Sequence, residues 1–414
     1  MSNVTTIEGC VLDALPLMEA GSVHMCATSP PFWGLRVYSG EPSDWPAVTY
    51  TPMSGLAEVE VEAWTGQLGM EPTPEMYVGH LVEVFRLVRR VLRDDGTLWL
   101  NLGDSYARNG GTPGGGNREV LHMEGKQCRM TRIPRGCGLK AKDLIGLPWR
   151  VAFALQADGW WLRSEIVWAK GVSFCADYAG SVMPESVTDR PTRAHEQVFL
   201  LTKKANYYYD NEAVKERTRK EKGSVSVRSW QYFAENADPA GGGYRGDGGL
   251  KDRINPGSRN LRSVWLINPE PSSLSHYAGW PSRLVAPMIR AGTSERGVCP
   301  ACAAPYERVV EKAGQFKSPE GRTSLYADNG ARGKAGTTSV FRTGTVAITK
   351  TLGWRPTCRC EAAEPVPATV LDIFGGTGTT ADVAWRLGRR CVLVDRSSAY
   401  VEMQHERLAQ QELF

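Results

Sequence analysis

The sequence predicts an α/β fold in which a doubly wound, largely parallel twisted sheet carries helices on both faces. Strand-like and helix-like stretches alternate through residues 1–203, as is typical of such a sheet. A second alternation closes the chain, where a strand, a glycine turn, a helix and another strand follow one another over residues 369–395. A basic, glycine-rich stretch between these parts breaks the pattern, so we expect an inserted segment there.

The elements of the first part follow from the spacing of apolar residues. A helix is expected from Pro74 to Gly96, because apolar side chains recur there with the period of an amphipathic helix. A second helix is expected over residues 143–159. Buried strands are expected at residues 22–27, 97–103, 161–170 and 196–203.

The composition is that of an ordinary globular protein, with 42% hydrophobic and 23% charged residues in 414. No stretch reaches the roughly 18 to 20 apolar residues that cross a bilayer, and the first residues lack the features of a secretory signal. We therefore expect a cytoplasmic protein without a membrane partner. The net charge of +4 permits nucleic acid as a partner and does not establish it.

A rigid loop follows the first expected strand and has the sequence TSPPFW at residues 28–33. Two consecutive prolines cannot continue a helix or donate to a sheet ladder, so the backbone is fixed and extended there. Taken alone, the loop is equally well a stiff surface turn with a core aromatic residue. A functional interpretation depends on which residues lie beside it.

A glycine turn near the other end of the chain has the sequence GGTG at residues 375–378, between a strand and a helix expected at residues 379–387. The next expected strand ends at Asp395, 23 residues after Asp372. An acid about 20 residues beyond a glycine loop usually holds a nucleotide ribose. The spacing is not GxGxxG and no lysine follows the turn, so a smaller nucleoside is expected rather than a dinucleotide or a triphosphate.

The two loops together resemble those of DNA amino-methyltransferases that use S-adenosylmethionine, and their order resembles the β class of that family. Blocks similar to those of bacterial and phage members lie at residues 102–106, 142–150, 157–170, 189–203 and 276–292. The resemblance implies a Rossmann-like methyltransferase sheet with a circularly permuted motif order. It also implies a site-specific DNA-methyltransferase that moves a methyl group to the exocyclic amine of a flipped base.

The resemblance implies catalytic roles for Ser29, Pro30, Pro31 and Phe32. The Ser29 hydroxyl and the Pro30 carbonyl would accept the hydrogens of the amine, and Phe32 would stack on the base. Trp33 is expected to line the same pocket. The cofactor-binding residues implied are Asp372, Phe374, Gly375, Gly376, Gly378, Thr379, Thr380 and Asp395, with His276 and Tyr277 from a segment that closes over the cofactor.

The first residue of the tetrapeptide predicts the base. In the family, serine is more often found in N4-cytosine enzymes, so Ser29 favours N4-cytosine, and N6-adenine is the alternative. A C5-cytosine enzyme is disfavoured, because it needs a cysteine nucleophile, usually after a proline, and the chain has no Pro-Cys pair. Methylation of a protein or RNA amide is disfavoured, because such relatives usually begin the tetrapeptide with Asn and place the cofactor loop first.

Four of the ten cysteines form two close pairs, Cys299 with Cys302 and Cys358 with Cys360. Paired cysteines in a cytosolic protein are typical of a zinc site built from four thiolates. Four cysteine ligands leave no open position for metal catalysis, so structural zinc is expected. Free thiols and a redox pair are the alternatives, and nothing around the first pair resembles a thioredoxin motif.

The expected organisation has five segments. Residues 1–203 form the catalytic half of the core, 204–265 the target-recognition region, 266–297 the cofactor-closing segment, 298–362 the zinc module with a flexible loop, and 363–414 the half that binds S-adenosylmethionine. Residues 203–262 hold 13 Lys and Arg against 8 Asp and Glu, interleaved with aromatic residues, which suits contacts with phosphates and bases. A solvated insertion is the alternative.

The expected partners are double-stranded DNA and, in a restriction-modification setting, a cognate restriction endonuclease. The sequence leaves the target site and the oligomeric state open. A competing function from another class is a zinc-containing DNA-binding protein with a dead methyltransferase core. The intact tetrapeptide and the two intact acids of the cofactor half disfavour it.

Overall fold

The computed structural model describes residues 3–35, 38, 41–107, 138–175, 180–217, 225–226, 253–254, 258–270, 279–313, 348–361 and 364–411. The chain divides into two compact units. The larger one comprises Met1–Val214, Arg262–Glu307 and Pro356–Phe414, and the smaller one Lys215–Leu261 and Arg308–Arg355. Most of the predicted target-recognition region, 204–265, lies outside the described residues, and the five-segment division remains a prediction.

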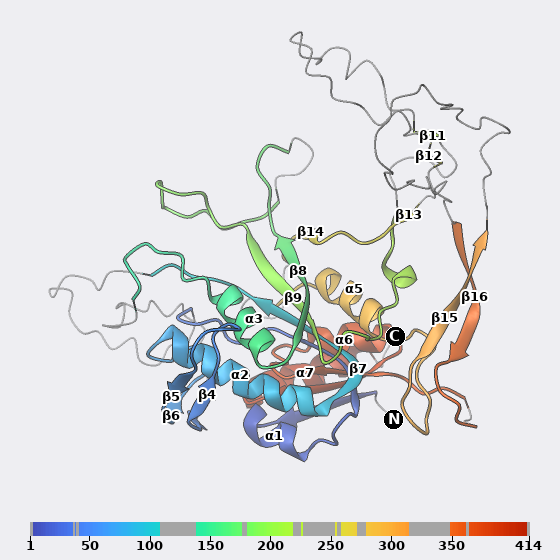
Figure 1. The fold of residues 1–414 in the computed structure, drawn as a ribbon, viewed down its shortest axis with the longest axis horizontal. Coiled ribbons are helices and arrows are strands. Elements are labelled where there is room, and N and C mark those ends of the chain that lie inside the picture. The colour runs from blue at the N-terminus through green and yellow to red at the C-terminus, as the bar shows by residue number, and fades with distance from the viewer. Residues whose placement is uncertain are drawn as a thin grey trace, which may run out of the picture. The chain divides into compact units, whose positions relative to one another are not determined.

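Within the described residues, the larger unit is built around an eight-stranded sheet in the order β1-β18-β17-β2-β7-β9-β8-β14 (Figure 1). Its strands are β1 (Val4–Glu8), β2 (Val23–Thr28), β7 (Leu92–Leu102), β8 (Trp161–Ala169), β9 (His195–Thr202), β14 (Val264–Leu266), β17 (Thr369–Asp372) and β18 (Arg390–Asp395). Neighbours from β1 to β7 are parallel, as are β8 and β14. Strand β9 is antiparallel to β7 and β8.

The predicted α/β fold is confirmed, and the permuted order is visible in the sheet. Strands β17 and β18, from the end of the chain, lie between β1 and β2 from its beginning. Parallel strands have their carboxyl ends at one edge of the sheet, which is where such folds bind ligands. The ends of β17 and β2 therefore meet there, although they are far apart in the sequence.

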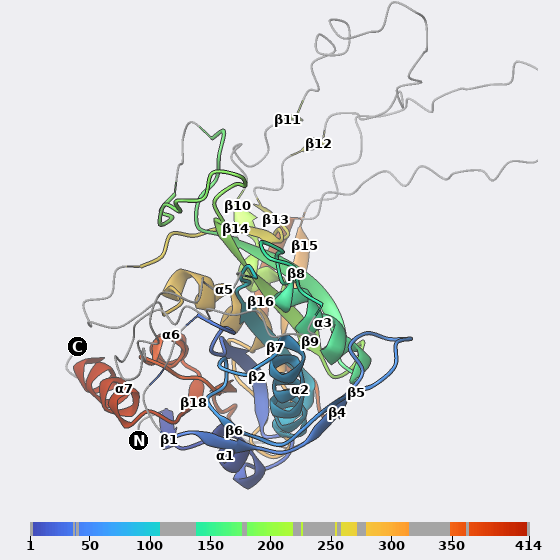
Figure 2. The same cartoon turned by 90° about the vertical axis from the view of Figure 1, so that its left-hand side faces the viewer.

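Helices cover both faces of the sheet (Figures 1 and 2). The helices α1 (Val11–Leu17), α2 (Pro74–Val91) and α3 (Leu147–Ala157) pack side by side on one face. The helices α5 (Ser282–Gly292), α6 (Thr379–Arg386) and α7 (Ser398–Gln411) lie on the other. Among the described residues, no helix combines the length and the apolar character that crossing a membrane requires.

Two predicted helix boundaries were wrong, for reasons of tertiary structure. Helix α2 ends at Val91, and Gly96 lies inside β7 rather than after the helix. A Cβ at Gly96 would lie 2.9 Å from the carbonyl oxygen of His24, so glycine permits the close approach of β7 to β2. Helix α3 begins at Leu147 rather than near residue 143. At this first residue the Asp104 carboxylate accepts a hydrogen bond from the backbone N–H of Leu147 at 3.0 Å.

Short strands complete the described structure. In the larger unit β3 (Ser43–Trp45) pairs with β6 (Trp64–Gly66), and β4 (Val48–Tyr50) pairs with β5 (Val59–Val61). The smaller unit contains β10 (Glu216–Arg217), β11 (Val225–Ser226), β12 (Arg253–Ile254) and β13 (Ser258–Arg259). The two-stranded sheet of β15 (Tyr306–Ala313) and β16 (Ile348–Pro356) belongs largely to this unit, and η1 (Glu212–Val214) is a 3-10 turn of the larger one.

Candidate active site

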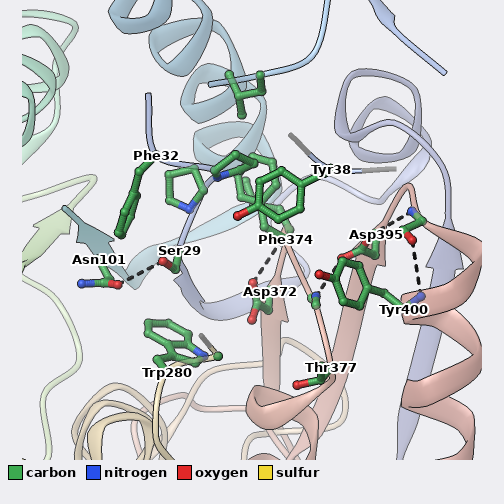
Figure 3. A pocket seen from close by; sticks show the side chains of 18 of the residues that line it. Ser29, Phe32, Tyr38, Asn101, Trp280, Asp372, Phe374, Thr377, Asp395 and Tyr400 are labelled. Carbon is green, nitrogen blue, oxygen red and sulfur yellow. Dashed lines mark hydrogen bonds between the residues drawn. The ribbon is translucent and has the colours of Figure 1, made fainter. Parts of the chain in front are cut away.

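A cavity of about 610 Å³ lies at the carboxyl ends of the central strands, and both predicted loops line it (Figure 3). The catalytic tetrapeptide contributes all four residues, Ser29, Pro30, Pro31 and Phe32. The cofactor half contributes Asp372, Phe374, Gly375, Gly376, Thr377, Thr379 and Asp395. The structure therefore brings together two segments whose combination was predicted from the sequence.

A buried carboxylate, that of Asp372, joins the two loops. Its Oδ1 accepts a hydrogen bond from the Thr28 hydroxyl at 2.8 Å and one from the Phe374 backbone N–H at 3.2 Å. Its Oδ2 accepts from the Thr380 hydroxyl at 2.6 Å. Burial raises the pKa of Asp372, and the hydrogen bonds from the two threonines partly offset this shift. Thr380, expected at the cofactor, is fully buried and faces Asp372 rather than the cavity.

Asp395, at the end of the neighbouring strand β18, organises the glycine turn. Its Oδ2 accepts from the backbone N–H of Gly376 at 2.7 Å, and its Oδ1 accepts from that of Ser397 at 2.9 Å. Burial raises the pKa of Asp395 to about 6, although these two N–H groups lower it in part. Gly376 and Gly378 have φ values of +48° and +78°, which favour glycine. Gly378 is the N-cap residue of α6 and does not line the cavity.

The Ser29 hydroxyl is oriented by Asn101, a residue that the sequence analysis did not single out. Ser29 Oγ donates to Asn101 Oδ1 at 3.0 Å, and Asn101 Nδ2 donates to the carbonyl of Gln197 at 3.1 Å. Because the Gln197 carbonyl fixes the amide, the oxygen of Asn101 faces Ser29. The hydrogen of Ser29 is thus already used, and its lone pairs remain available as acceptors. Asn101 was detectable as the polar residue near the end of an apolar strand.

Of the two aromatic residues predicted at the site, Phe32 lines the cavity and Trp33 does not. Trp33 is 5% exposed, donates its Nε1–H to the Glu71 carbonyl at 2.9 Å and does not line the cavity. Trp280 lines it instead, and Figure 3 shows Phe32 and Trp280 on opposite sides of Ser29. A Cβ at Gly103 would lie 2.5 Å from the Phe32 ring, so glycine leaves room for that ring.

The predicted residues His276 and Tyr277 lie outside the described part of the chain. The residues that follow them, Gly279 and Trp280, line the cavity. A Cβ at Gly279 would lie 3.6 Å from Thr377 Oγ1, so this segment approaches the glycine turn closely.

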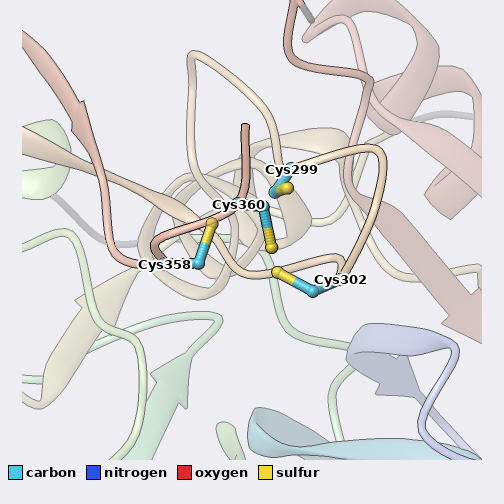
Figure 4. A group of neighbouring side chains, drawn as sticks. All are labelled: Cys299, Cys302, Cys358 and Cys360. Atoms are coloured by element: carbon cyan, nitrogen blue, oxygen red, sulfur yellow. The ribbon is translucent and has the colours of Figure 1, made fainter. Parts of the chain in front are cut away.

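A second cluster contains the four paired cysteines (Figure 4). The sulfur atoms of Cys299, Cys302, Cys358 and Cys360 all lie within 4.8 Å of one another. The backbone N–H of Cys302 and that of Ala301 lower the pKa of the Cys299 thiol to about 7, against the opposing effect of burial. The structure thus assembles the four thiols as the sequence predicted.

The turn that carries the first cysteine pair is held at the amino ends of the central strands. His24 on β2 accepts at Nδ1 from the Thr369 N–H at 3.0 Å, so its Nε2 carries the proton and donates to the Ala303 carbonyl, also at 3.0 Å. Burial lowers the pKa of His24 to about 4, so the ring is neutral. Arg93 on β7 donates to the Cys302 carbonyl at 3.0 Å. The cysteine cluster and the cavity therefore lie at opposite ends of the same strands.

The chain has clear relatives among known proteins. A family model described as DNA methylase, N6_N4_Mtase, matches residues 23–299 and 361–406, well over half of the chain. The Type II methyltransferase M.Cfr9I of Citrobacter freundii is 38% identical over 296 residues, which are 71% of this chain and 74% of that protein. The Type II methyltransferase M.SmaI of Serratia marcescens is 36% identical over 291 residues, 70% of this chain and 76% of that protein.

Among solved structures, the PvuII DNA methyltransferase (cytosine-N4-specific) matches 98% of this chain and 86% of its own, with a TM-score of 0.49 and 14% identity. The family match and the sequence relatives confirm the family predicted from the two loops. The chain therefore belongs to the N6_N4_Mtase family of DNA methylases and is a DNA amino-methyltransferase.

Proposed function

We propose that this chain transfers the methyl group of S-adenosylmethionine to N4 of a flipped cytosine at a specific site in double-stranded DNA. The hydrogen bond from Thr28 to Asp372 supports this proposal most directly, because it ties the tetrapeptide and the glycine turn to one cavity. The choice of cytosine rests on Ser29, which in this family is more often found in N4-cytosine enzymes.

The glycine-turn side of the cavity fits S-adenosylmethionine in its donor and acceptor chemistry. A carboxylate oxygen has two lone-pair sites. The oxygens of Asp395 each accept one backbone N–H, so each retains an acceptor site for a ribose hydroxyl. The hydroxyls of Thr377 and Thr379 lie at the amino end of α6, which favours a carboxylate such as that of methionine. When bound, the cofactor supplies an electrophilic methyl carbon on a sulfonium.

The tetrapeptide side prepares the amine. An exocyclic amine is a poor nucleophile, because its lone pair is delocalised into the base. Ser29 Oγ and the Pro30 carbonyl accept its two hydrogens and favour a geometry in which the lone pair is localised. Ser29 is ready as an acceptor because its own hydrogen is donated to Asn101. Such preorganised groups act by orientation and electrostatics.

The base itself is held between aromatic side chains. Phe32 and Trp280 flank Ser29 in the cavity, so a planar base that presents its amine to Ser29 would stack on these rings (Figure 3). Stacking offsets part of the unstacking cost of a few kcal/mol. Residues 204–265 and the chain between the cysteine pairs would read the target sequence, as their basic and aromatic character suggests.

Mass spectrometry of nucleosides tests this proposal. DNA from a host that expresses the chain should contain N4-methylcytosine, and DNA from a host that expresses Ser29→Ala should not. N6-methyladenine in its place would reject the assignment of the base. If labelled methyl groups pass from the purified protein to RNA or protein and never to DNA, the proposal is wrong as a whole. A cognate restriction endonuclease encoded nearby would fit a Type II system.

The cysteine cluster is proposed to hold one structural zinc ion. A Zn–S bond of about 2.3 Å places four sulfurs of a tetrahedron about 3.8 Å apart. The sulfurs here, all within 4.8 Å of one another, are compatible with that spacing. Elemental analysis should find one zinc per chain, and Cys360→Ser should lower the zinc content and the thermal unfolding temperature. Full-length protein that is stable without metal would contradict the site.

A further inference from the structure

Glu71 and His80 form a buried ionisable pair close to the tetrapeptide, and neither residue lines the cavity. Glu71 and the α2 residue His80 are both 0% exposed, and Glu71 Oε1 lies 3.0 Å from His80 Nδ1. The imidazole is stacked on the ring of Trp45, with centroids 4.5 Å apart, and the ring of Trp64 lies 5.8 Å from it. Burying a carboxylate is costly unless it is paired and hydrogen-bonded, so the pair needs an explanation.

Glu71 is connected to the catalytic loop by hydrogen bonds. Its Oε2 accepts from the Gly69 N–H at 2.8 Å, and the Gly69 carbonyl accepts from the Gly34 N–H at 2.8 Å. The carbonyl of Glu71 accepts from the indole N–H of Trp33 at 2.9 Å. Both contacts act on residues that directly follow the tetrapeptide.

The backbone packing is equally tight at this point. Gly69 has a φ of +91°, and a Cβ on it would lie 3.2 Å from the Phe32 carbonyl oxygen. The hydroxyl of the buried α2 residue Tyr77 donates to the Pro31 carbonyl at 2.9 Å. The tetrapeptide thus packs against Gly69 and Tyr77, neither of which lines the cavity.

The two prolines explain why such support is needed. Pro30 and Pro31 have no N–H, so this part of the loop is held only through carbonyls, through the N–H groups that follow and through side chains. Three of those groups have partners on Tyr77, Gly69 or Glu71, namely the Pro31 carbonyl, the Gly34 N–H and the Trp33 indole.

We infer that the buried Glu71–His80 pair positions the tetrapeptide for methyl transfer, and this inference rests on the proposed function. The pair acts through the hydrogen bond from the Gly69 N–H to the Glu71 carboxylate, and neither side chain lines the cavity. Glu71 and His80 are therefore positioning residues. A misplacement of about 1 Å in the reacting geometry can lower a rate on the order of 100-fold, so loss of the pair should affect the rate more than the fold.

The test replaces both partners at once, so that neither is left buried and alone. The double variant Glu71→Met/His80→Phe keeps side chains of similar size, and such replacements are often neutral or stabilising. We expect an unchanged or higher unfolding temperature, unchanged affinity for S-adenosylhomocysteine and a fall in kcat of roughly 10- to 100-fold on unmethylated, amplified genomic DNA. The matched control is Glu75→Met, on the helix α2 that also carries His80. It removes a partly exposed partner of Arg150 and should leave kcat unchanged.

Three results separate the possibilities. A double variant with the kcat of the wild type would overturn the inference while the proposed function stands. If neither the wild type nor Glu75→Met methylates DNA, the proposed function fails and the inference fails with it. If the double variant does not fold, Glu71→Met alone decides, because it removes the carboxylate that accepts from the Gly69 N–H and leaves no buried carboxylate unpaired. An unchanged kcat in that variant would also overturn the inference.

Discussion

Cofactor affinity should fall in acid because of Asp395. Burial raises the pKa of this carboxyl from its ordinary value of 3.8 to about 6 in the cofactor-free protein. Ribose hydroxyls donate hydrogen bonds, so they bind the ionised carboxylate. Affinity is therefore fully present above about pH 7 and is lost as the pH falls through 6. At about pH 5 only about one site in ten is ionised, so the Kd should be about tenfold higher than at about pH 7.5, or about 1.4 kcal/mol.

Calorimetric titration with S-adenosylhomocysteine across this pH range is the assay. The control is Asp395→Asn, which cannot ionise and reports any pH dependence that comes from the ligand. This variant should bind about 1.5 to 3 kcal/mol more weakly at neutral pH, the usual contribution of a hydrogen bond to a charged group, and its Kd should be flat between about pH 5 and 7.5. A wild-type Kd as flat as that of the variant would refute ribose binding by Asp395.

Three further predictions concern the tetrapeptide. Asn101→Ala should lower kcat roughly five- to tenfold with unchanged affinity for S-adenosylhomocysteine, because the Ser29 hydroxyl loses the bond that orients it. Gly103→Ala should displace the Phe32 ring, at about 1 to 3 kcal/mol of strain, and should raise the KM for DNA in methylation assays. Thr28→Val should lower the unfolding temperature, the cofactor affinity and kcat together. It removes one hydrogen bond to the buried carboxylate at the end of β17, worth about 1.5 to 3 kcal/mol.

The fold was predictable because each central element has its own local signal. The helix at Pro74–Val91 is visible as an apolar stripe, and the strands around it as short apolar runs. The glycine turn was predictable for a similar reason, since Gly376 and Gly378 adopt backbone conformations that few other residues tolerate. The convergence of the two loops followed from their family resemblance and from the meeting of parallel strand ends.

The supporting residues were not predictable, because their roles depend on neighbours that are distant in the sequence. Trp33 follows the tetrapeptide and was expected to line the cavity, yet the adjacent turn directs its ring into the core. Glu71 has no local pattern that marks it as buried and hydrogen-bonded, and Asn101 stands out only as a polar residue near the end of an apolar strand. Trp280, which lines the cavity beside Ser29, comes from the segment that precedes α5.

The hydrogen bonds of Asp372 explain how a permuted order of loops can still give one site. The tetrapeptide follows Thr28 at the end of β2, and the glycine turn follows Asp372 at the end of β17. These two strand ends are 344 residues apart in the sequence, and the Asp372 carboxylate is hydrogen-bonded at both. Its two oxygens are shared between Thr28 on the catalytic side and Phe374 and Thr380 on the cofactor side. If the end of β2 or the end of β17 moved, the hydrogen bond between Thr28 and Asp372 would break. The carboxylate of Asp372 therefore sets the position of the amine acceptors and that of the cofactor turn together.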